Sequence, residues 1–208
     1  MAEAALVANE TVAQMIARKA PIEEIGAVLD ALDHDARWAQ LSGLGKGPQR
    51  DLYELAASAP PISLEHFVPA DVADVTPVRH EGRNTLPSLP GLNLFAKVFA
   101  RKPDGSIVGY NDSPVGPFVG PGYYTAVDTP DKWQERGPVV VDYYQPPADG
   151  PVPSDWPRIR PNWMGLQILV YFQTRDFMRR VSTHVSIGAA YKWDNMMLDN
   201  YFVLCRVP

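Results

Sequence analysis

The distribution of proline divides this chain into two regimes. The 208 residues include 21 prolines, about twice the usual share. They concentrate in residues 60–90, 103–138 and 146–161, whereas Pro21 alone falls within the first 47 positions. Proline interrupts helix interiors and the hydrogen-bond ladders of central strands. The contrast therefore favours a helical first third followed by a body of short strands, turns and extended loops.

The first third carries apolar residues at helical spacing. Residues 4–19 show one such pattern. The clearest pattern follows Pro21, where apolar residues fall at i, i+3, i+7 and i+10 and two glutamates lie near the positive end of the helix dipole. Asp33 or Asp35 can cap a third helix, and a fourth follows the glycine-rich stretch after it. We expect residues 1–60 to form a helical bundle or arm.

From about residue 75 the sequence is typical of strands. Leu92–Ala100 and Ser106–Tyr110 flank a Lys-Pro-Asp-Gly turn, which predicts a β-hairpin. Phe118–Val127 predicts a strand broken by a Gly-Pro-Gly corner. Pro138–Tyr144 is rich in β-branched and aromatic residues and predicts another strand.

The end of the chain predicts one more helix and two closing strands. Thr174–Val181 has helical composition, with Thr174 as its cap. Thr183–Tyr191 and Asn200–Val207 predict strands joined by a turn at Asp194-Asn195. The proline-rich residues 145–162 before them predict a long extended loop of the kind that covers a site or an interface.

These patterns predict an α+β fold. An N-terminal helical segment, residues 1–60, precedes a β-rich body, residues 61–208, built as a curved antiparallel sheet or small β-barrel with one helix in the C-terminal half. Folds of this kind commonly hold a ligand inside or at the mouth.

Charge and cysteine content exclude several classes of protein. The net charge is −5, and no run of five cations occurs, so we expect no nucleic-acid partner. The single Cys205 cannot form an internal disulfide. No segment has the length of a membrane helix or the pattern of a signal peptide. We expect a cytoplasmic protein without a membrane partner.

No signature of a nucleotide or zinc site is present. Residues 43–47 are glycine-rich, but their spacing differs from that of a phosphate-binding loop, and Pro48 occupies the position of its hydroxyl residue. One cysteine and four separated histidines, at 34, 66, 80 and 184, predict no metal site. We therefore expect neither a metal nor a cofactor.

Tyrosines on the predicted strands form the first candidate site. Alternation lets Tyr110, Tyr123 and Tyr143 line one concave face. Asp112 or Asp142 can then orient a ligand hydroxyl or accept its proton. The alternative is that these tyrosines only pack and cover strand edges.

Basic and imidazole side chains form the other candidates. Arg179 or Arg180 can clamp a carboxylate or phosphate, with His184 nearby, whereas the alternative for the predicted helix is a surface ion pair from Asp176 to Arg180. His80, beside an arginine, is kept neutral and can act as a base, or it lies in a solvated loop.

Three functional hypotheses follow. The leading one is a protein that binds a small apolar or aromatic molecule in a pocket lined by the tyrosines. The second is a cofactor-free acid–base enzyme, with His184 or His80 as base, an aspartate as orienting group and an arginine as anion clamp. The third is an interaction module or homo-oligomer that docks through the N-terminal helices.

Overall fold

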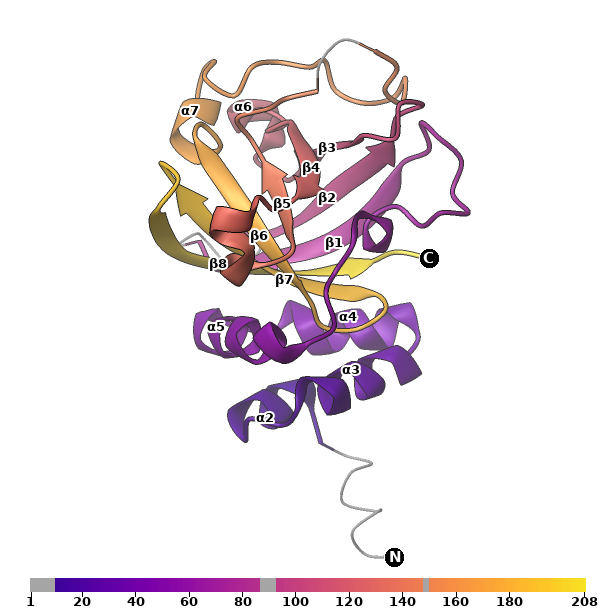
Figure 1. Ribbon diagram of the computed structural model, residues 1–208, viewed down its shortest axis with the longest axis vertical. Helices are drawn as coiled ribbons and strands as arrows, with labels where there is room; N and C mark the ends of the chain where they lie inside the picture. The colour runs from indigo at the N-terminus through magenta and orange to yellow at the C-terminus, as the bar shows by residue number, and fades with distance from the viewer. Residues whose placement is uncertain (1–9, 87–92, 148–149) are drawn as a thin grey trace, which may run out of the picture.

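A computed structural model describes residues 10–86, 93–147 and 150–208 (Figure 1). It shows a layer of N-terminal helices beneath a closed antiparallel barrel of eight strands, with a short helix late in the chain. The predicted α+β class and the predicted barrel are confirmed. The start of the first predicted helix, residues 4–9, and Leu92 lie outside the described residues.

In the described residues the helices of the N-terminal layer come first and the strands follow. The helical layer consists of α2 (Val12–Ala17), α3 (Ile22–Ala31), α4 (His34–Ser42) and α5 (Lys46–Leu55). The strands are β1 (Val78–Asn84), β2 (Leu94–Arg101), β3 (Ile107–Asp112), β4 (Tyr124–Asp128), β5 (Val139–Asp142), β6 (Thr174–Arg180), β7 (Val185–Lys192) and β8 (Met196–Arg206). Short helical turns connect them: η1 (Ala56–Ser58), η2 (Leu64–His66), α6 (Gly116–Val119), η3 (Asp131–Arg136) and α7 (Gln167–Val170).

Local sequence determines where the helices begin. Thr11 and Gln14 form a capping box at the start of α2, each side chain accepting from the other's backbone N–H. Of the two predicted caps for α4, Asp33 is the one used, because its carboxylate accepts from the Ala36 N–H at 2.8 Å. The fourth helix, α5, begins at Lys46, within the glycine-rich stretch that was expected to precede it.

The barrel is a closed meander. Each strand pairs antiparallel with the next, and β8 pairs with β1 to close the ring. The predicted hairpin is the β2–β3 pair, which turns at residues 102–105, and the predicted turn at Asp194-Asn195 joins β7 to β8. Closure leaves no unpaired strand edge in the ring.

Side chains alternate between the barrel interior and its outer face. In β2, Phe95, Lys97 and Phe99 point inward, whereas Val98 and Ala100 point outward against Trp156 of the proline-rich loop. The inward-facing apolar side chains fill one end of the barrel, where the chain segment around η2 closes it: Phe67, Val78, Phe99, Ile107, Tyr124, Val139, Val141, Met178 and Leu204. The other end, beside α6 and α7, remains open.

Two interior glycines make room for aromatic rings. A Cβ atom on Gly109 would lie 2.5 Å from the ring of Tyr124, and one on Gly188 would lie 2.2 Å from the ring of Phe202. These rings therefore lie directly against the barrel wall.

The helical layer covers one side of the barrel. The helix α5 lies against β7 and β8, α4 lies against β8 and β1, and α2 and α3 form a second layer below them (Figure 1). The outward-facing apolar residues of β7 and β8 join the helices in a continuous core: Val185, Ile187, Ala189, Tyr201, Val203 and Cys205. Because the core crosses the interface, the boundary between residues 60 and 61 stays a prediction about folding units.

The predicted helix at Thr174–Val181 is wrong, because this segment is strand β6. Thr174, Asp176 and Met178 alternate inward along it, and its backbone pairs with β5 and β7. Pairing on both sides overrides the weak helix preference of its arginine and methionine residues. The predicted ion pair from Asp176 to Arg180 does not form, since residues four apart on a strand are too far from each other.

The segment Phe118–Val127 is only partly a strand. Its first residues belong to the single turn α6, and β4 begins at Tyr124, after the Gly-Pro-Gly stretch. Gly120 and Gly122 adopt φ values of 109° and 56°, so the corner there is a full break and not a bulge. Within the described ranges, no helix is both long and apolar enough to cross a membrane.

Gly26 of α3 tests the contact between the helices and the barrel. A Cβ atom there would lie 2.7 Å from the Val181 carbonyl oxygen. We expect Gly26→Ala to lower the free energy of unfolding by about 1–3 kcal/mol through overpacking, although alanine is the better helix former. Urea denaturation gives the value. Gly43→Ala is the control, because no atom lies within 4 Å of its Cβ position; equal stability of both variants would contradict the contact.

Candidate functional site

The open end of the barrel holds a cavity of about 390 Å³. This volume lies in the range of small-molecule pockets in proteins. The lining comes from six of the eight strands and from α7 and the segments beside α6. The cavity therefore exists because the ring is closed, and no single segment of the chain contains it.

A buried ion pair lies at the floor of this cavity. The Lys97 ammonium of β2 lies 3.0 Å from Asp176 Oδ2 of β6. It also donates to Asn111 Oδ1 at 3.0 Å and to the hydroxyl of Tyr143. An ammonium has three N–H donors, so each of them has an acceptor. Lys97 is 1% exposed and Asp176 5% exposed, which is rare for charged residues.

Burial opposes the charge on both members of the pair. It lowers the pKa of Lys97, against the favourable effect of Asp176. Burial likewise raises the pKa of Asp176, against the favourable effects of Lys97 and Tyr143. Aromatic rings replace part of the lost hydration: those of Tyr124 and Phe202 have their centroids 4.8 and 5.0 Å from the ammonium nitrogen. The contacts with each other, with Tyr143 and Asn111 and with the aromatic rings stabilise the charged pair.

Tyr143 connects the polar groups. Its hydroxyl accepts from Asn111 Nδ2 at 3.0 Å and lies 3.2 Å from Asp176 Oδ2. Burial raises the pKa of this phenol well above its ordinary value, so the hydroxyl keeps its proton. Its ring stacks on Tyr171 with centroids 5.3 Å apart. The tyrosine is therefore fixed in both position and protonation state.

One acceptor of the cluster faces the cavity without a partner. Asp176 lines the cavity, and its Oδ2 atom takes the contacts with Lys97 and Tyr143. No hydrogen bond among the described residues uses its other oxygen, Oδ1. A molecule in the cavity that carries an N–H or O–H donor can bind there.

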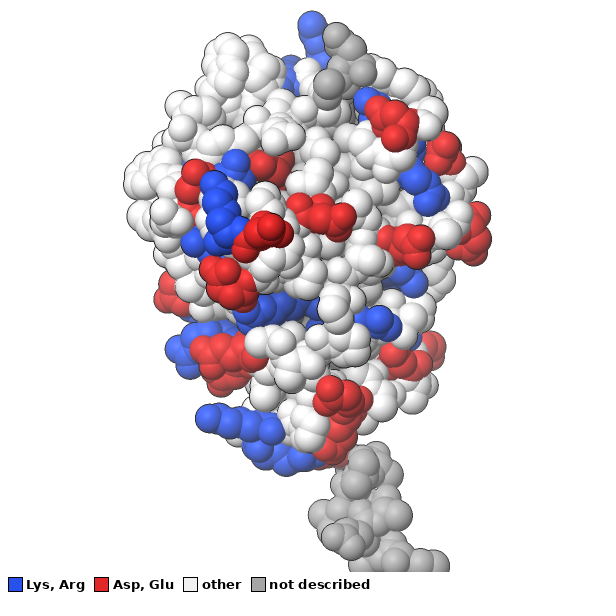
Figure 2. Space-filling view, viewed as in Figure 1, with Lys and Arg blue, Asp and Glu red and all other residues white. Residues whose placement is uncertain are grey.

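The walls above the polar floor are apolar, and the rim is mixed. Phe95, Leu169, Val170, Leu198 and Phe202 form the apolar part of the lining. The half-buried polar groups at the rim include Asn84, Lys192 and Asn200. Figure 2 shows that the surface over α7 is largely free of charged side chains, whereas both signs intermix on the rest of this face. The cavity therefore has apolar walls between a polar floor and a rim that carries polar groups.

Of the three predicted tyrosines, only Tyr143 lines the cavity. Tyr110 and Tyr123 lie on the outer face, where their rings pack 5.1 and 6.2 Å from Trp156. Strand alternation turns Tyr124, the neighbour of Tyr123, inward in its place. The structure does not bring the three tyrosines onto one face.

The two predicted aspartates lie outside the barrel. Asp112 accepts from Arg79 Nη1 at 2.7 Å, and both side chains are half exposed. Asp142 accepts from Arg175 Nε at 3.0 Å on the outer face of the sheet. Each carboxylate is therefore paired with an arginine and remote from the cavity floor.

The predicted histidines and arginines are separate from one another. His80 is buried at the closed end, with Nε2 3.0 Å from the Phe67 carbonyl oxygen. His184 lies beside Arg206 at 3.2 Å, and burial lowers its pKa. Arg179 donates to the carbonyls of Tyr53 and Glu135 and thereby fastens α5 to the barrel.

Arg180 lines a small hollow together with His66 and Arg206. The acid–base set that combined a histidine, an aspartate and an arginine is therefore not assembled. Among the described residues, no three His, Cys, Asp or Glu side chains lie close enough together to hold a metal ion.

Sequence reasoning missed Lys97, Asn111 and Asp176. Lys97 is the only charged residue inside an otherwise apolar run of β2, and that interruption was the available signal. Asp176 was assigned to a helix surface because β6 was not recognised. Cys205 is 0% exposed and faces the helices, and burial raises its pKa to about 11.

Comparisons with known proteins name no relative. No protein-family model matches the sequence, and neither a curated protein nor a solved structure is significantly similar to it. The geometry of the cavity is therefore the basis for any assignment.

The buried pair makes a prediction about stability. Lys97→Met or Asp176→Leu alone leaves one buried charge without its partner, and we expect each to lower the free energy of unfolding by about 3–5 kcal/mol. The double variant should recover most of this loss, because no uncompensated charge remains. Urea denaturation of the four proteins gives a double-mutant cycle. Additive losses would contradict the coupling.

His80 makes a prediction about pH. Burial lowers its pKa to about 3, whereas in the unfolded chain it is about 6.5. Between these values only the unfolded chain takes up the proton, so the folded state loses stability as the pH falls from 6.5 towards 3, by about 1.4 kcal/mol per pH unit.

In the variant His80→Leu the free energy of unfolding should fall less steeply with decreasing pH, because the variant has no imidazole to protonate at this position. Urea denaturation at pH values from 4 to 7 measures the free energy of unfolding for both proteins. Parallel curves for the two proteins would contradict the assignment.

Proposed function

We propose that this protein binds a small amphipathic molecule in the open end of the barrel. The observation that carries the proposal is the Lys97–Asp176 pair at the floor of a cavity with apolar walls. A buried ion pair contributes little stability in comparison with apolar residues of the same volume. Its position in a cavity of ligand size is what a recognition site requires.

The chemistry of the lining indicates the ligand class. Phe95, Phe202 and Leu198 offer contact area to an apolar body. Asp176 Oδ1 offers a charged acceptor to an N–H or O–H group, and such a bond is stronger than one between neutral groups. We therefore propose a small, largely apolar ligand with one hydrogen-bond donor at its inner end.

We do not extend the proposal to catalysis by the predicted histidines. His80 and His184 meet a carbonyl and an arginine in place of Asp112 or Asp142. Acid–base chemistry needs base and orienting group within hydrogen-bond reach or one water of each other. Assembly into homo-oligomers through the helical layer stays a prediction.

Two matched fluorescent probes test the proposal. We expect 1-aminoanthracene, an apolar amine, to bind at least about tenfold tighter than anthracene, because only the amine can donate to Asp176. The double variant Lys97→Met/Asp176→Leu keeps the apolar walls and should bind both probes alike. Fluorescence titration gives the dissociation constants.

The control removes an ion pair on the outer face. The double variant Arg79→Gln/Asp112→Asn should retain the preference for the amine, because this pair is remote from the cavity. Failure of both probes to bind the wild-type protein, or an equal preference in wild type and the Lys97/Asp176 variant, would overturn the proposal.

A further inference from the structure

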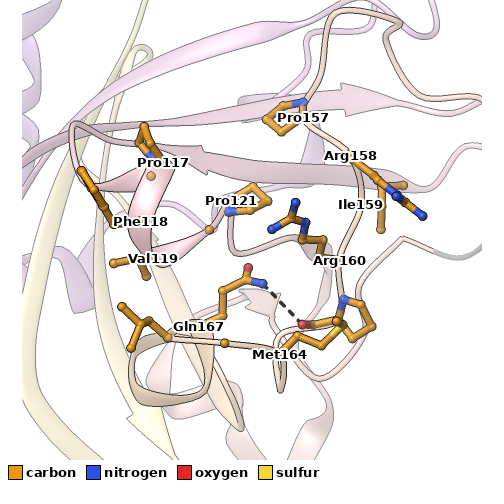
Figure 3. Close-up of a pocket in the computed structure, with 15 residues that line it drawn as sticks. Pro117, Phe118, Val119, Pro121, Pro157, Arg158, Ile159, Arg160, Met164 and Gln167 are labelled. Atoms are coloured by element: carbon orange, nitrogen blue, oxygen red, sulfur yellow. Dashed lines mark hydrogen bonds between the residues drawn. The ribbon is translucent and has the colours of Figure 1, made fainter.

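A second hollow lies outside the barrel, next to its open end. Its volume is about 690 Å³, and its walls are α6, residues 157–161 of the proline-rich loop, and the start of α7 (Figure 3). No aspartate or glutamate is among the described residues that line it, whereas Arg158 and Arg160 both belong to the lining. The hollow is therefore a basic site in a chain that is acidic as a whole.

The two arginines differ in direction. Figure 3 shows the guanidinium of Arg160 pointing into the hollow, toward Pro121 and Gln167, whereas that of Arg158 points away from it. No hydrogen bond or ion pair among the described residues engages the Arg160 side chain. A guanidinium presents paired N–H donors that match a carboxylate or phosphate. The unengaged group inside the hollow is thus available to an anion.

The walls around Arg160 are apolar and exposed. Phe118 is 81% exposed, Leu166 53% and Met164 44%. Large apolar side chains gathered at one place on a surface mark an interaction site more often than isolated ones do. An anion with a hydrocarbon body can contact both the guanidinium and these side chains.

Gln167 holds the walls together. The residue is buried, and its Oε1 atom accepts from the Gly122 N–H at 2.8 Å while Nε2 lies 3.4 Å from the Pro161 carbonyl oxygen. One side chain thereby links α7 to both the corner after α6 and the proline-rich loop. The prolines of the walls add stiffness, because each fixes its own φ angle. The hollow is preorganised, which lowers the entropic cost of binding.

We propose that this hollow binds the anionic head of an amphipathic molecule, a carboxylate or phosphate on a hydrocarbon chain, with Arg160 as its anion-binding residue. The site is separate from the barrel cavity. The head lies at the guanidinium, and the first part of the chain lies against Phe118, Met164 and Leu166. The same chemistry is offered by a free fatty acid and by an anionic lipid in a membrane.

Isothermal titration with decanoate below its micelle concentration tests the site in the full-length protein. We expect decanoate to bind at least about tenfold more tightly than methyl decanoate, which lacks both the charge and a hydrogen-bond donor, and than acetate, which lacks the chain. Arg160→Gln should lose about tenfold in decanoate affinity. Arg158→Gln removes the same charge from the same loop and should lose less than about twofold, since its side chain points away.

A flotation assay distinguishes the two sources of the ligand. Vesicles of phosphatidylcholine with phosphatidic acid replace decanoate, and pure phosphatidylcholine vesicles are the control. Binding of decanoate alone supports a site for free amphipathic acids, whereas binding of the acidic vesicles alone supports a site for a lipid head group. In either case Arg160→Gln should weaken the binding that is observed, and Arg158→Gln should not.

Three outcomes would overturn the proposal: no binding of either anion, equal affinity for methyl decanoate and decanoate, or equal losses in the Arg158 and Arg160 variants. The Lys97→Met/Asp176→Leu protein serves as a reference for the barrel cavity. Its decanoate affinity should equal that of the wild type, because the substitutions leave the hollow unchanged. The proposals for the hollow and for the barrel cavity can therefore fail separately.

Discussion

Closure of the ring between β1 and β8 is the constraint on which the rest of this structure depends. The strands β2 and β6 are four places apart in the order of the barrel, which in a flat sheet separates them by about 19 Å. Closure brings them face to face, so that Lys97 and Asp176 meet at 3.0 Å across the interior. The ion pair exists only in the closed barrel and joins opposite walls.

The interior is divided by this pair into two parts with different chemistry. Towards the η2 segment the barrel is filled with buried apolar and aromatic side chains. Towards α6 and α7 it contains charged and amide groups around a cavity. The two ends of the barrel thus differ in packing and polarity, and the helical layer lies along the side of the barrel, against β7 and β8.

The fold was predictable from the sequence where the signals were local. The turn at residues 102–105 and the Asp33 cap depend on neighbouring residues, and both are as expected. Strand β6 was not predictable in this way, because its composition is neutral and its conformation is imposed by β5 and β7.

The site was less predictable for the same reason. Alternation predicted that Tyr110, Tyr123 and Tyr143 share one concave face, whereas in the structure Tyr110 and Tyr123 lie on the outside and only Tyr143 lines the cavity. The partner of Lys97 lies on a distant strand, and only the barrel register brings the two together. The sequence pattern of one strand shows which side chains share a face. Which residue on another strand each of them contacts depends on the register of the whole barrel.

The interior glycines of β3 and β7 have a consequence for the size of the cavity. The rings of Tyr124 and Phe202 occupy the places that side chains at Gly109 and Gly188 would otherwise take, and the same two rings face the Lys97 ammonium. Any larger residue at either glycine would push a ring towards the barrel axis, onto the cation and into the space above it. Neither glycine lines the cavity, so the space around the cation can change through positions that lie outside the cavity lining.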